Sequence, residues 1–129
     1  MKRGDIINAR LAGELARLGH TDLVVVCDAG LPIPPGPAVA DLAFRLGVPR
    51  FETVLSGLLE ELVVEGVTAA EETRENPEVA GVLRDLLPDL GLVPHHELKR
   101  MSANAKLVVR TGEATPPYAN VILRCGVAF

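Results

Sequence analysis

The sequence predicts an α/β fold: a three-layer α/β/α sandwich around a largely parallel, mixed central sheet. Short apolar segments alternate along the chain with segments whose apolar residues recur at helical spacing, and this alternation is typical of βα units. The run "LVVVC" at 23–27 contains no polar residue apart from its thiol, as expected of a strand covered on both faces. With 48% hydrophobic residues, the 129-residue chain can form one domain, 1–129, with its own core.

Each element follows from a local pattern. In the first expected helix, residues 7, 11, 15 and 18 are apolar and Gly19 supplies a C-terminal stop. Four prolines between 30 and 37 exclude a helix interior or a central strand there. The expected helices are 6–18, 51–62, 76–87, which starts on an Asn-Pro pair, and 95–105. The expected strands are 23–27, 38–44, the beginning of 63–72, 91–93, 106–113 and 120–127.

Composition excludes several classes of partner. Thirteen Lys and Arg against 17 Asp and Glu give a net charge of −4 without a basic run, so we expect no nucleic-acid partner. No apolar stretch approaches the roughly 20 residues that cross a bilayer, and the first ten residues lack a signal-peptide core. We therefore expect no membrane partner and a cytoplasmic location. Cys27 and Cys125 lie in apolar runs, which favours buried thiols over a disulfide, and no spacing indicates a metal site.

Polar residues follow two of the expected strands. Function in open α/β sheets collects beyond the carboxyl ends of strands, and Asp28 follows 23–27 while "TGE" and then "PPYAN" follow 107–110. From the residues alone, Asp28 is as easily a loop residue that accepts hydrogen bonds from backbone amides before Gly30. Tyr118 with Asn120 could bind a polyol, because a tyrosine ring both packs and hydrogen-bonds, or it could simply pack a Pro-Pro turn.

The histidines are ambiguous from spacing alone. His20 follows Gly19, so it could interact with helix-terminal carbonyls or act in proton transfer near neutral pH. His95 and His96 point about 100° apart on a helix, so one of them at most faces a given pocket. Lys99 shares the face of His95, four residues earlier.

Seven segments, taken together, resemble the D-ribose pyranase family. They occur in family order and span nearly the whole chain: "GHTDLVVVCDAGLPIP" (19–34), "GVPRF" (47–51), "AEE" (70–72), "NP" (76–77), "HHELK" (95–99), "RTGE" (110–113) and "YANVIL" (118–123). The related fucose mutarotases have a "GHGD" plus "DAHFPAH" pattern, whereas this chain has "GHTD" and "DAGLPIP". The resemblance therefore favours the ribose branch.

This resemblance implies an isomerase that interconverts the pyranose and furanose forms of D-ribose by general acid/base catalysis, with no cofactor and no metal. The family's proton-donor histidine falls on His20. The family's substrate-binding residues fall on Asp28, His95 rather than His96, Lys99, Tyr118, Ala119 and Asn120. Two alternatives stay open, namely a mutarotase for fucose or another monosaccharide and a sugar-binding or regulatory protein without catalysis.

The separation of His20 from Asp28 favours a shared site. If residues 20–28 were extended, their ends would lie up to about 26 Å apart at about 3.3 Å per residue, too far for both to contact one pentose. Either the turn at 19–22 folds back or two chains contribute. The resemblance implies a ring-shaped homo-oligomer, a decamer of two stacked pentamers, with sites between subunits.

Overall fold

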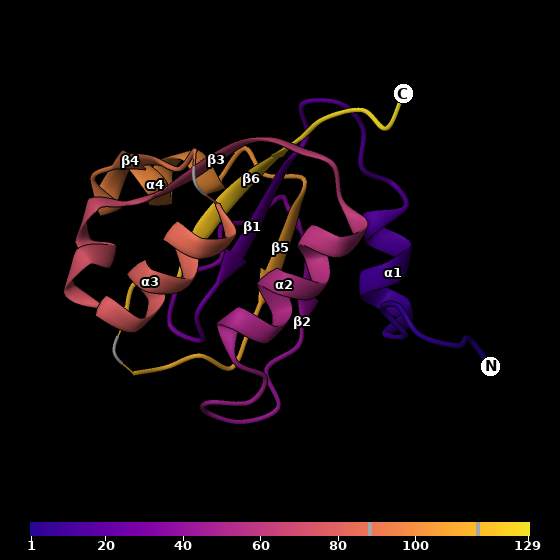
Figure 1. Ribbon diagram of the computed structural model, residues 1–129, viewed down its shortest axis with the longest axis horizontal. Helices are drawn as coiled ribbons and strands as arrows, with labels where there is room; N and C mark the ends of the chain where they lie inside the picture. The colour runs from indigo at the N-terminus through magenta and orange to yellow at the C-terminus, as the bar shows by residue number, and fades with distance from the viewer. Residues whose placement is uncertain (88, 116) are drawn as a thin grey trace.

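The computed structural model describes residues 1–87, 89–115 and 117–129. Within these residues a six-stranded sheet has the order β2-β5-β1-β6-β3-β4 (Figure 1). β1 runs parallel to β5, β5 parallel to β2 and β3 parallel to β4, while β6 runs antiparallel to its two neighbours. The predicted α/β class with a largely parallel, mixed sheet is confirmed. No helix among the described residues is long and apolar enough to traverse a lipid bilayer.

The predicted elements occur in the predicted order; β1 and β4 have the predicted bounds, and most of the others are shorter. The strands are β1 (Leu23–Cys27), β2 (Ala38–Asp41), β3 (Val64–Ala70), β4 (Gly91–Val93), β5 (Leu107–Arg110) and β6 (Val121–Cys125). The helices are α1 (Ala9–Leu15), α2 (Phe51–Glu61), α3 (Pro77–Leu86), α4 (His95–Ser102) and the 3-10 helix η1 (Glu71–Glu75). Pro116, in the expected loop before β6, lies outside the described residues.

The sheet is buried on both faces, as the uninterrupted apolar run of β1 predicts. Val24 and Val26 belong to one core cluster, whereas Val25 and Cys27 belong to the cluster on the opposite face, because successive side chains of a strand alternate. The first cluster packs under α1, α2 and α3, and the second packs under α4. Helices on both faces give the predicted three layers.

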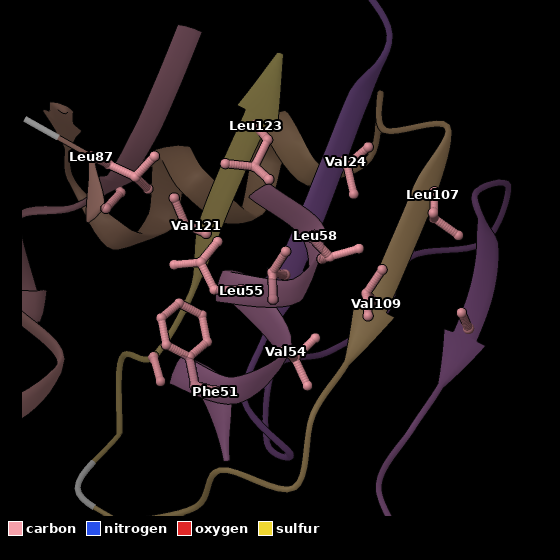
Figure 2. Packing of buried hydrophobic residues seen from close by; sticks show 14 of the residues in the cluster. Val24, Phe51, Val54, Leu55, Leu58, Leu87, Leu107, Val109, Val121 and Leu123 are labelled. Carbon is pink, nitrogen blue, oxygen red and sulfur yellow. The ribbon is translucent and has the colours of Figure 1, made fainter. Parts of the chain in front are cut away.

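Helix α2 supplies much of the larger core. Phe51, Leu55 and Leu58 are almost completely buried, and Figure 2 shows them packed between α2 and the side chains of Val121 and Leu123 on β6. Truncation of one such leucine to alanine removes its burial and leaves a cavity, which costs about 3 kcal/mol in typical cores. This core holds α2 over the middle of the sheet.

The first helix is shorter than predicted. It was expected from Ile6, but Asn8 is its N-cap, because the Asn8 side chain accepts a hydrogen bond from the Leu11 amide at 2.9 Å. Ile7 therefore lies before the helix and is 69% exposed, so its apolar character does not belong to the helix face. The helix ends at Leu15, and Gly19 belongs instead to the following turn, where its amide donates to Asp22.

One edge of the sheet gathers the loops that follow β1, β3, β4 and β5. Because β6 runs antiparallel, its amino end opens at this edge as well. The loop between β5 and β6 therefore lies beside the loops after β1 and β3, and the polar residues that follow these strands meet there. We call this edge the carboxyl edge and the opposite one, where β1 begins, the amino edge.

Candidate functional site

A cavity of about 170 Å³ opens at the carboxyl edge. Its polar lining comes from three separate segments of the chain: the loop after β1, the first turns of α4 and the loop before β6. These lining side chains are Asp28, His95, Lys99, Tyr118 and Asn120. The fold thus brings together five of the seven residues that the sequence singles out.

Asp28 and Asn120 form the buried floor of this cavity and are 6% and 2% exposed. Asp28 Oδ1 accepts hydrogen bonds from the backbone amides of Gly30 at 3.0 Å and Leu31 at 2.9 Å. The Asp28 amide donates to Asn120 Oδ1 at 3.0 Å, and Asn120 Nδ2 lies 3.5 Å from Asp28 Oδ2. Asp28 therefore stabilises its own loop and also lines the cavity, so the two interpretations of this residue are compatible.

His95 and Tyr118 form the aromatic wall. Their ring centroids lie 5.2 Å apart at an interplanar angle of 80°, an edge-to-face contact. His95 Nδ1 is buried and makes no hydrogen bond to any described residue, so it can accept or donate one to a ligand in the cavity. Lys99 lies one turn further along α4 and lines the same cavity, whereas His96 is exposed.

Ala119 has a different environment from its neighbours. Its side chain is completely buried in the larger core cluster and does not line the cavity. Any contact between Ala119 and a ligand must therefore use its backbone. The roles that the resemblance implies for Ala119 and the five lining residues stay predictions.

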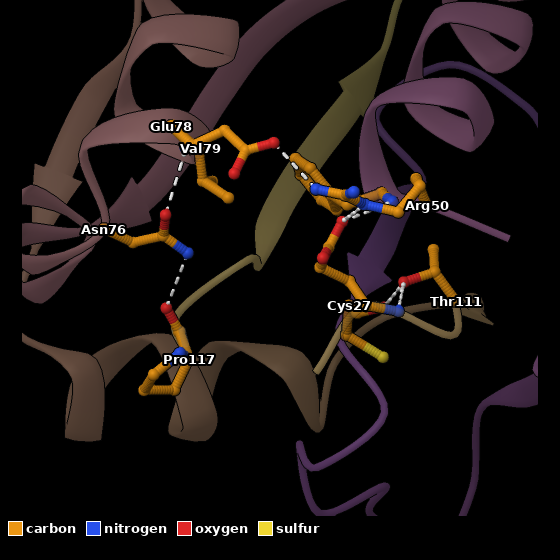
Figure 3. Close-up of polar contacts among 9 residues, drawn as sticks. Cys27, Arg50, Asn76, Glu78, Val79, Thr111 and Pro117 are labelled. Atoms are coloured by element: carbon orange, nitrogen blue, oxygen red, sulfur yellow. Dashed lines mark hydrogen bonds and ion pairs between the residues drawn. The ribbon is translucent and has the colours of Figure 1, made fainter. Parts of the chain in front are cut away.

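The loop that carries Tyr118 is anchored at its start by Glu113. This carboxylate, 6% exposed, accepts hydrogen bonds from Arg50 Nε at 2.9 Å and from the Phe51 amide at 3.1 Å (Figure 3). Arg50 also donates to Glu78 at 2.7 Å. The hydrogen bond with Glu113, together with the two negative charges, raises the pKa of Arg50 above its ordinary value.

Two of the segments that resemble the family, 47–51 and 110–113, pack closely against each other beside this anchor. A Cβ at Gly112 would lie 2.2 Å from the Val48 carbonyl oxygen, so no other residue fits there without moving the backbone. The Gly112 amide donates to the Pro49 carbonyl at 2.9 Å. The "GVPRF" and "RTGE" segments therefore pack directly against each other and fix the start of the Tyr118 loop.

His20 lies at the amino edge, on the far end of β1 from Asp28. The five residues of β1 alone extend about 16 Å at about 3.3 Å per residue. The 19–22 turn does not fold back to the cavity: its Thr21 amide donates to the Cys125 carbonyl at 2.9 Å, at the other end of β6 from Asn120. Within one chain, His20 and the cavity are therefore separate.

Asp22 closes the turn that presents His20. Its Oδ2 accepts from the Gly19 amide at 2.7 Å and from Lys106 Nζ at 2.9 Å. These two interactions, the amide hydrogen bond first, hold the pKa of the Asp22 carboxyl below its usual value. Thr21 adopts a φ of 71°, a conformation that side chains rarely take and that the closed turn enforces. The "GHTD" segment is thus a compact turn with His20 at its tip.

A carboxylate also holds the His20 ring. His20 Nε2 lies 3.0 Å from Glu65 Oε2, and the other oxygen of Glu65 lies 3.2 Å from Arg124 Nε. The His20 side chain is 54% exposed and borders an open, mainly apolar hollow of about 500 Å³ formed with the C-terminal residues. Sequence reasoning missed Glu65, which lies 45 residues from His20 in the chain.

The remaining reactive groups are inert or dispersed. Cys27 and Cys125 are free buried thiols in the described structure, as the sequence predicts. Burial, with a smaller contribution from the Asp28 charge, raises the pKa of Cys27 to about 12, so its thiol stays protonated at neutral pH. No group of three or more His, Cys, Asp or Glu side chains within the described ranges is arranged to hold a metal ion.

Comparisons with known proteins show relatives of this chain in sequence and in fold. D-ribose pyranase 1 of Rubrobacter xylanophilus is 68% identical over 130 residues, and the alignment covers 100% of both chains. RbsD of Bacillus subtilis, solved in complex with D-ribose, is 45% identical with a TM-score of 0.94 over 100% of both chains. The fucose mutarotase of Streptococcus pneumoniae, solved with L-fucose, shares the fold, with 20% identity and a TM-score of 0.81 over 95% of each chain.

The match to a family model extends over residues 1–128, and that model describes the RbsD / FucU transport protein family. It spans the cavity at the carboxyl edge and the His20 turn at the amino edge alike. The chain therefore belongs to the RbsD / FucU transport protein family.

Proposed function

We propose that this chain is an isomerase that interconverts the pyranose and furanose forms of D-ribose. The proposal is supported by 68% identity over full length to a D-ribose pyranase and by the 0.94 TM-score to RbsD solved with D-ribose. The single observation in this chain that carries it is the cavity, which combines a buried carboxylate and amide with an aromatic wall. Sugars bind to such sites, because their hydroxyls need directional hydrogen bonds and their C–H faces need an aromatic ring.

The reaction needs proton transfer and no added atom. A base removes the proton of the anomeric hydroxyl, the bond between C1 and the ring oxygen breaks, and an acid delivers a proton to that ring oxygen. The C4 hydroxyl then attacks the aldehyde carbon of the open chain and loses its proton to a base, while an acid delivers a proton to the carbonyl oxygen. The atoms of the two ring forms are the same, and a group that titrates near neutral pH suits both directions.

His20 supplies this group in the proposal, and it acts in the cavity of a neighbouring subunit. Its half-exposed ring at the amino edge and its distance from Asp28 along β1 support a shared site. Exposed apolar side chains support association of subunits, since Ile7, Phe44 and Leu46 are each more than two-thirds exposed. The proposed assembly is the homo-oligomer expected from the sequence, a decamer of two pentamers, and its cytoplasmic location stays a prediction.

Each residue has a defined part in this mechanism. Asp28 and Asn120 bind the polyol from the cavity floor, and Tyr118 with His95 encloses it from the side. Lys99 adds a positively charged donor to the lining of the cavity. Because these groups are already held by the fold, the sugar is oriented before His20 acts, which lowers the entropic part of the barrier.

Co-expression of two inactive variants tests the shared site. His20→Ala removes the proton carrier, and Asp28→Asn weakens sugar binding while its side-chain oxygen still accepts from the Gly30 amide. If each site takes these residues from different subunits, about a quarter of sites in randomly mixed oligomers regain both groups. Ribose exchange, measured by saturation-transfer NMR well below KM, should return in doubly tagged mixed oligomers.

Recovery of no activity in those oligomers would contradict the shared site. The same NMR measurement on wild-type protein tests the reaction itself: exchange between ribose pyranose and furanose should be much faster with protein than without it. Acceleration of fucose exchange but not ribose exchange would replace the proposal by a mutarotase. Ribose binding without any acceleration would replace it by a sugar-binding protein.

A further inference from the structure

The segment 71–76, which comprises η1 and the N-cap of α3, lies behind the cavity and contacts both sides of its aromatic wall. Glu72 Oε2 accepts a hydrogen bond from the His95 amide at 2.8 Å. Thr73 Oγ1 donates to the Tyr118 carbonyl at 3.2 Å, and Asn76 Nδ2 donates to the Pro117 carbonyl at 3.0 Å. None of these three side chains lines the cavity itself.

The hydrogen bond that the His95 amide donates to Glu72 fixes the start of α4. His95 is the first residue of that helix, and its amide has no acceptor within the helix. A carboxylate at this point satisfies the amide and also interacts favourably with the positive end of the helix dipole. Because the capping group comes from η1 rather than from the preceding residue Pro94, the position of the His95 ring depends on the 71–76 segment.

The bonds from Thr73 and Asn76 hold a backbone that would otherwise relax. Tyr118 has a φ of 73°, which costs a bulky residue free energy unless the surroundings impose it. The carbonyls of Tyr118 and of the preceding Pro117 both accept from this segment. Thr73 is 3% and Asn76 1% exposed, so water competes little for either bond.

The oxygen and the nitrogen of the Asn76 side-chain amide make different contacts. Its oxygen accepts from the Val79 amide at 3.2 Å and caps α3, while its nitrogen donates to the Tyr118 loop (Figure 3). An aspartate at this position would keep the cap, since Asp and Asn are about equally good N-caps, but in place of the donor it would set a buried carboxylate oxygen against the Pro117 carbonyl. The two functions can therefore be separated by one substitution.

We propose that Glu72, Thr73 and Asn76 are positioning residues, which hold the His95 and Tyr118 rings in their edge-to-face contact and so fix the aromatic wall of the sugar cavity. This inference rests on the proposed function; it assigns a purpose to the "AEE" segment, for which sequence reasoning found none, and gives Asn76 a second purpose besides its cap of α3. The three residues make no contact with the sugar themselves and act only by placing the His95 and Tyr118 rings.

The experiment compares Thr73→Val and Asn76→Asp with wild type. Each removes one donor to the Tyr118 loop, and the wall should loosen. The ribose KM should rise about 10-fold with kcat nearly unchanged, because ground-state and transition-state binding are lost together. The NOE between the His95 and Tyr118 ring protons should weaken in both variants, and Thr73→Ser, which keeps the hydroxyl, should restore wild-type values.

Asn8→Asp makes the same substitution at the exposed N-cap of α1, far from the cavity, and so controls for the change of N-cap residue. It should leave KM and the NOE unchanged. A third variant, Glu72→Ala, tests the other side of the wall: hydrogen exchange at the His95 amide should become faster, and the NOE should again weaken.

Two results would overturn the inference. One is an unchanged NOE and KM in Thr73→Val and Asn76→Asp, and the other is a change no larger than that of Asn8→Asp. The NOE is measured without sugar, so the positioning can be tested even if the wild-type protein fails to accelerate ribose exchange. That failure would remove the proposed function and leave the ring placement as a separate, measured fact.

Discussion

The two ends of β1 differ in how completely one chain builds them. At the carboxyl edge, Asp28 and Asn120 are nearly buried and hydrogen-bonded to each other's segments. At the amino edge, the His20 side chain is 54% exposed and borders an open hollow. The comparison is consistent with the proposed division of the site, in which a single chain pre-forms the binding cavity and presents His20 outward for a neighbour.

The largest effect is expected from His20→Ala. Loss of a general acid/base group should slow ribose exchange about 10²- to 10⁴-fold, while ribose affinity should change far less, because the proposed binding residues that line the neighbouring subunit's cavity are unaltered. NMR exchange rates and calorimetric titration measure the two quantities. His96→Ala is the control, because that side chain is exposed outside the cavity and should leave both unchanged. An equal loss of rate and affinity would contradict the assignment of proton transfer to the amino edge and of sugar binding to the carboxyl edge.

Glu113→Ala should destabilise the carboxyl edge. The substitution leaves the Phe51 amide and one side of Arg50 without their buried partner, at a cost of about 2 kcal/mol in the free energy of unfolding. Glu78 is the other partner of Arg50, and its side chain is 64% exposed. Glu78→Ala should therefore cost less than about 0.5 kcal/mol. Urea unfolding compares the two. Similar costs would mean that burial of Glu113 contributes nothing.

Glu65→Gln should affect catalysis moderately. A carboxylate oxygen accepts and does not donate, so the Glu65 contact places the ring hydrogen of His20 on Nε2 and leaves Nδ1 as the acceptor. Loss of that preference should lower kcat about 5-fold without a change in ribose KM. Nitrogen-15 NMR of the His20 ring should show a mixed tautomer in the variant. A pure Nε2–H tautomer in the variant would refute this reasoning.

The smallest effect is expected from Asp22→Asn at acidic pH. The pKa of Asp22 is lowered in the folded protein, so its stabilising contribution is present above the unfolded value of about 3.9 and is lost as pH falls through the folded value. The wild type should therefore be more stable than the variant at pH 7, and the difference should shrink below about pH 4. Thermal midpoints between pH 7 and pH 3 measure it. A constant difference would exclude a charge effect of Asp22 on the His20 turn.

Local patterns accounted for much of the fold and part of the site. Asp28 and Asn120 could be identified because they lie next to apolar strands, and strand ends in a parallel sheet meet at one edge. Residues 76–77 could be identified as a helix start because the cap and the proline are adjacent in the chain. The first helix was predicted too long, since the alternative cap at Asn8 involves a side-chain bond that apolar spacing does not reveal.

The support behind the cavity could not be predicted. Thr73 and Asn76 bond to carbonyls 45 and 41 residues further along the chain, and Glu65 meets His20 across neighbouring segments. No periodicity or spacing connects such residues, because each pairing depends on the order of strands in the sheet. The resemblance to known sequences included Asn76 in its "NP" segment without indicating the bond to the Tyr118 loop, and its segments contain neither Thr73 nor Glu65.

The sequence by itself determined which segments are strands and helices and which strand is buried on both faces, because those properties depend on the period of apolar residues and on caps a few positions away. Tertiary structure alone decided that His95 and Tyr118 stand edge to face, that the 71–76 segment holds both, and that His20 lies at the opposite edge from Asp28. The physical reason is distance along the chain: a local pattern constrains a turn or two of backbone, whereas the shape of a cavity depends on hydrogen bonds between residues that the folded sheet brings together.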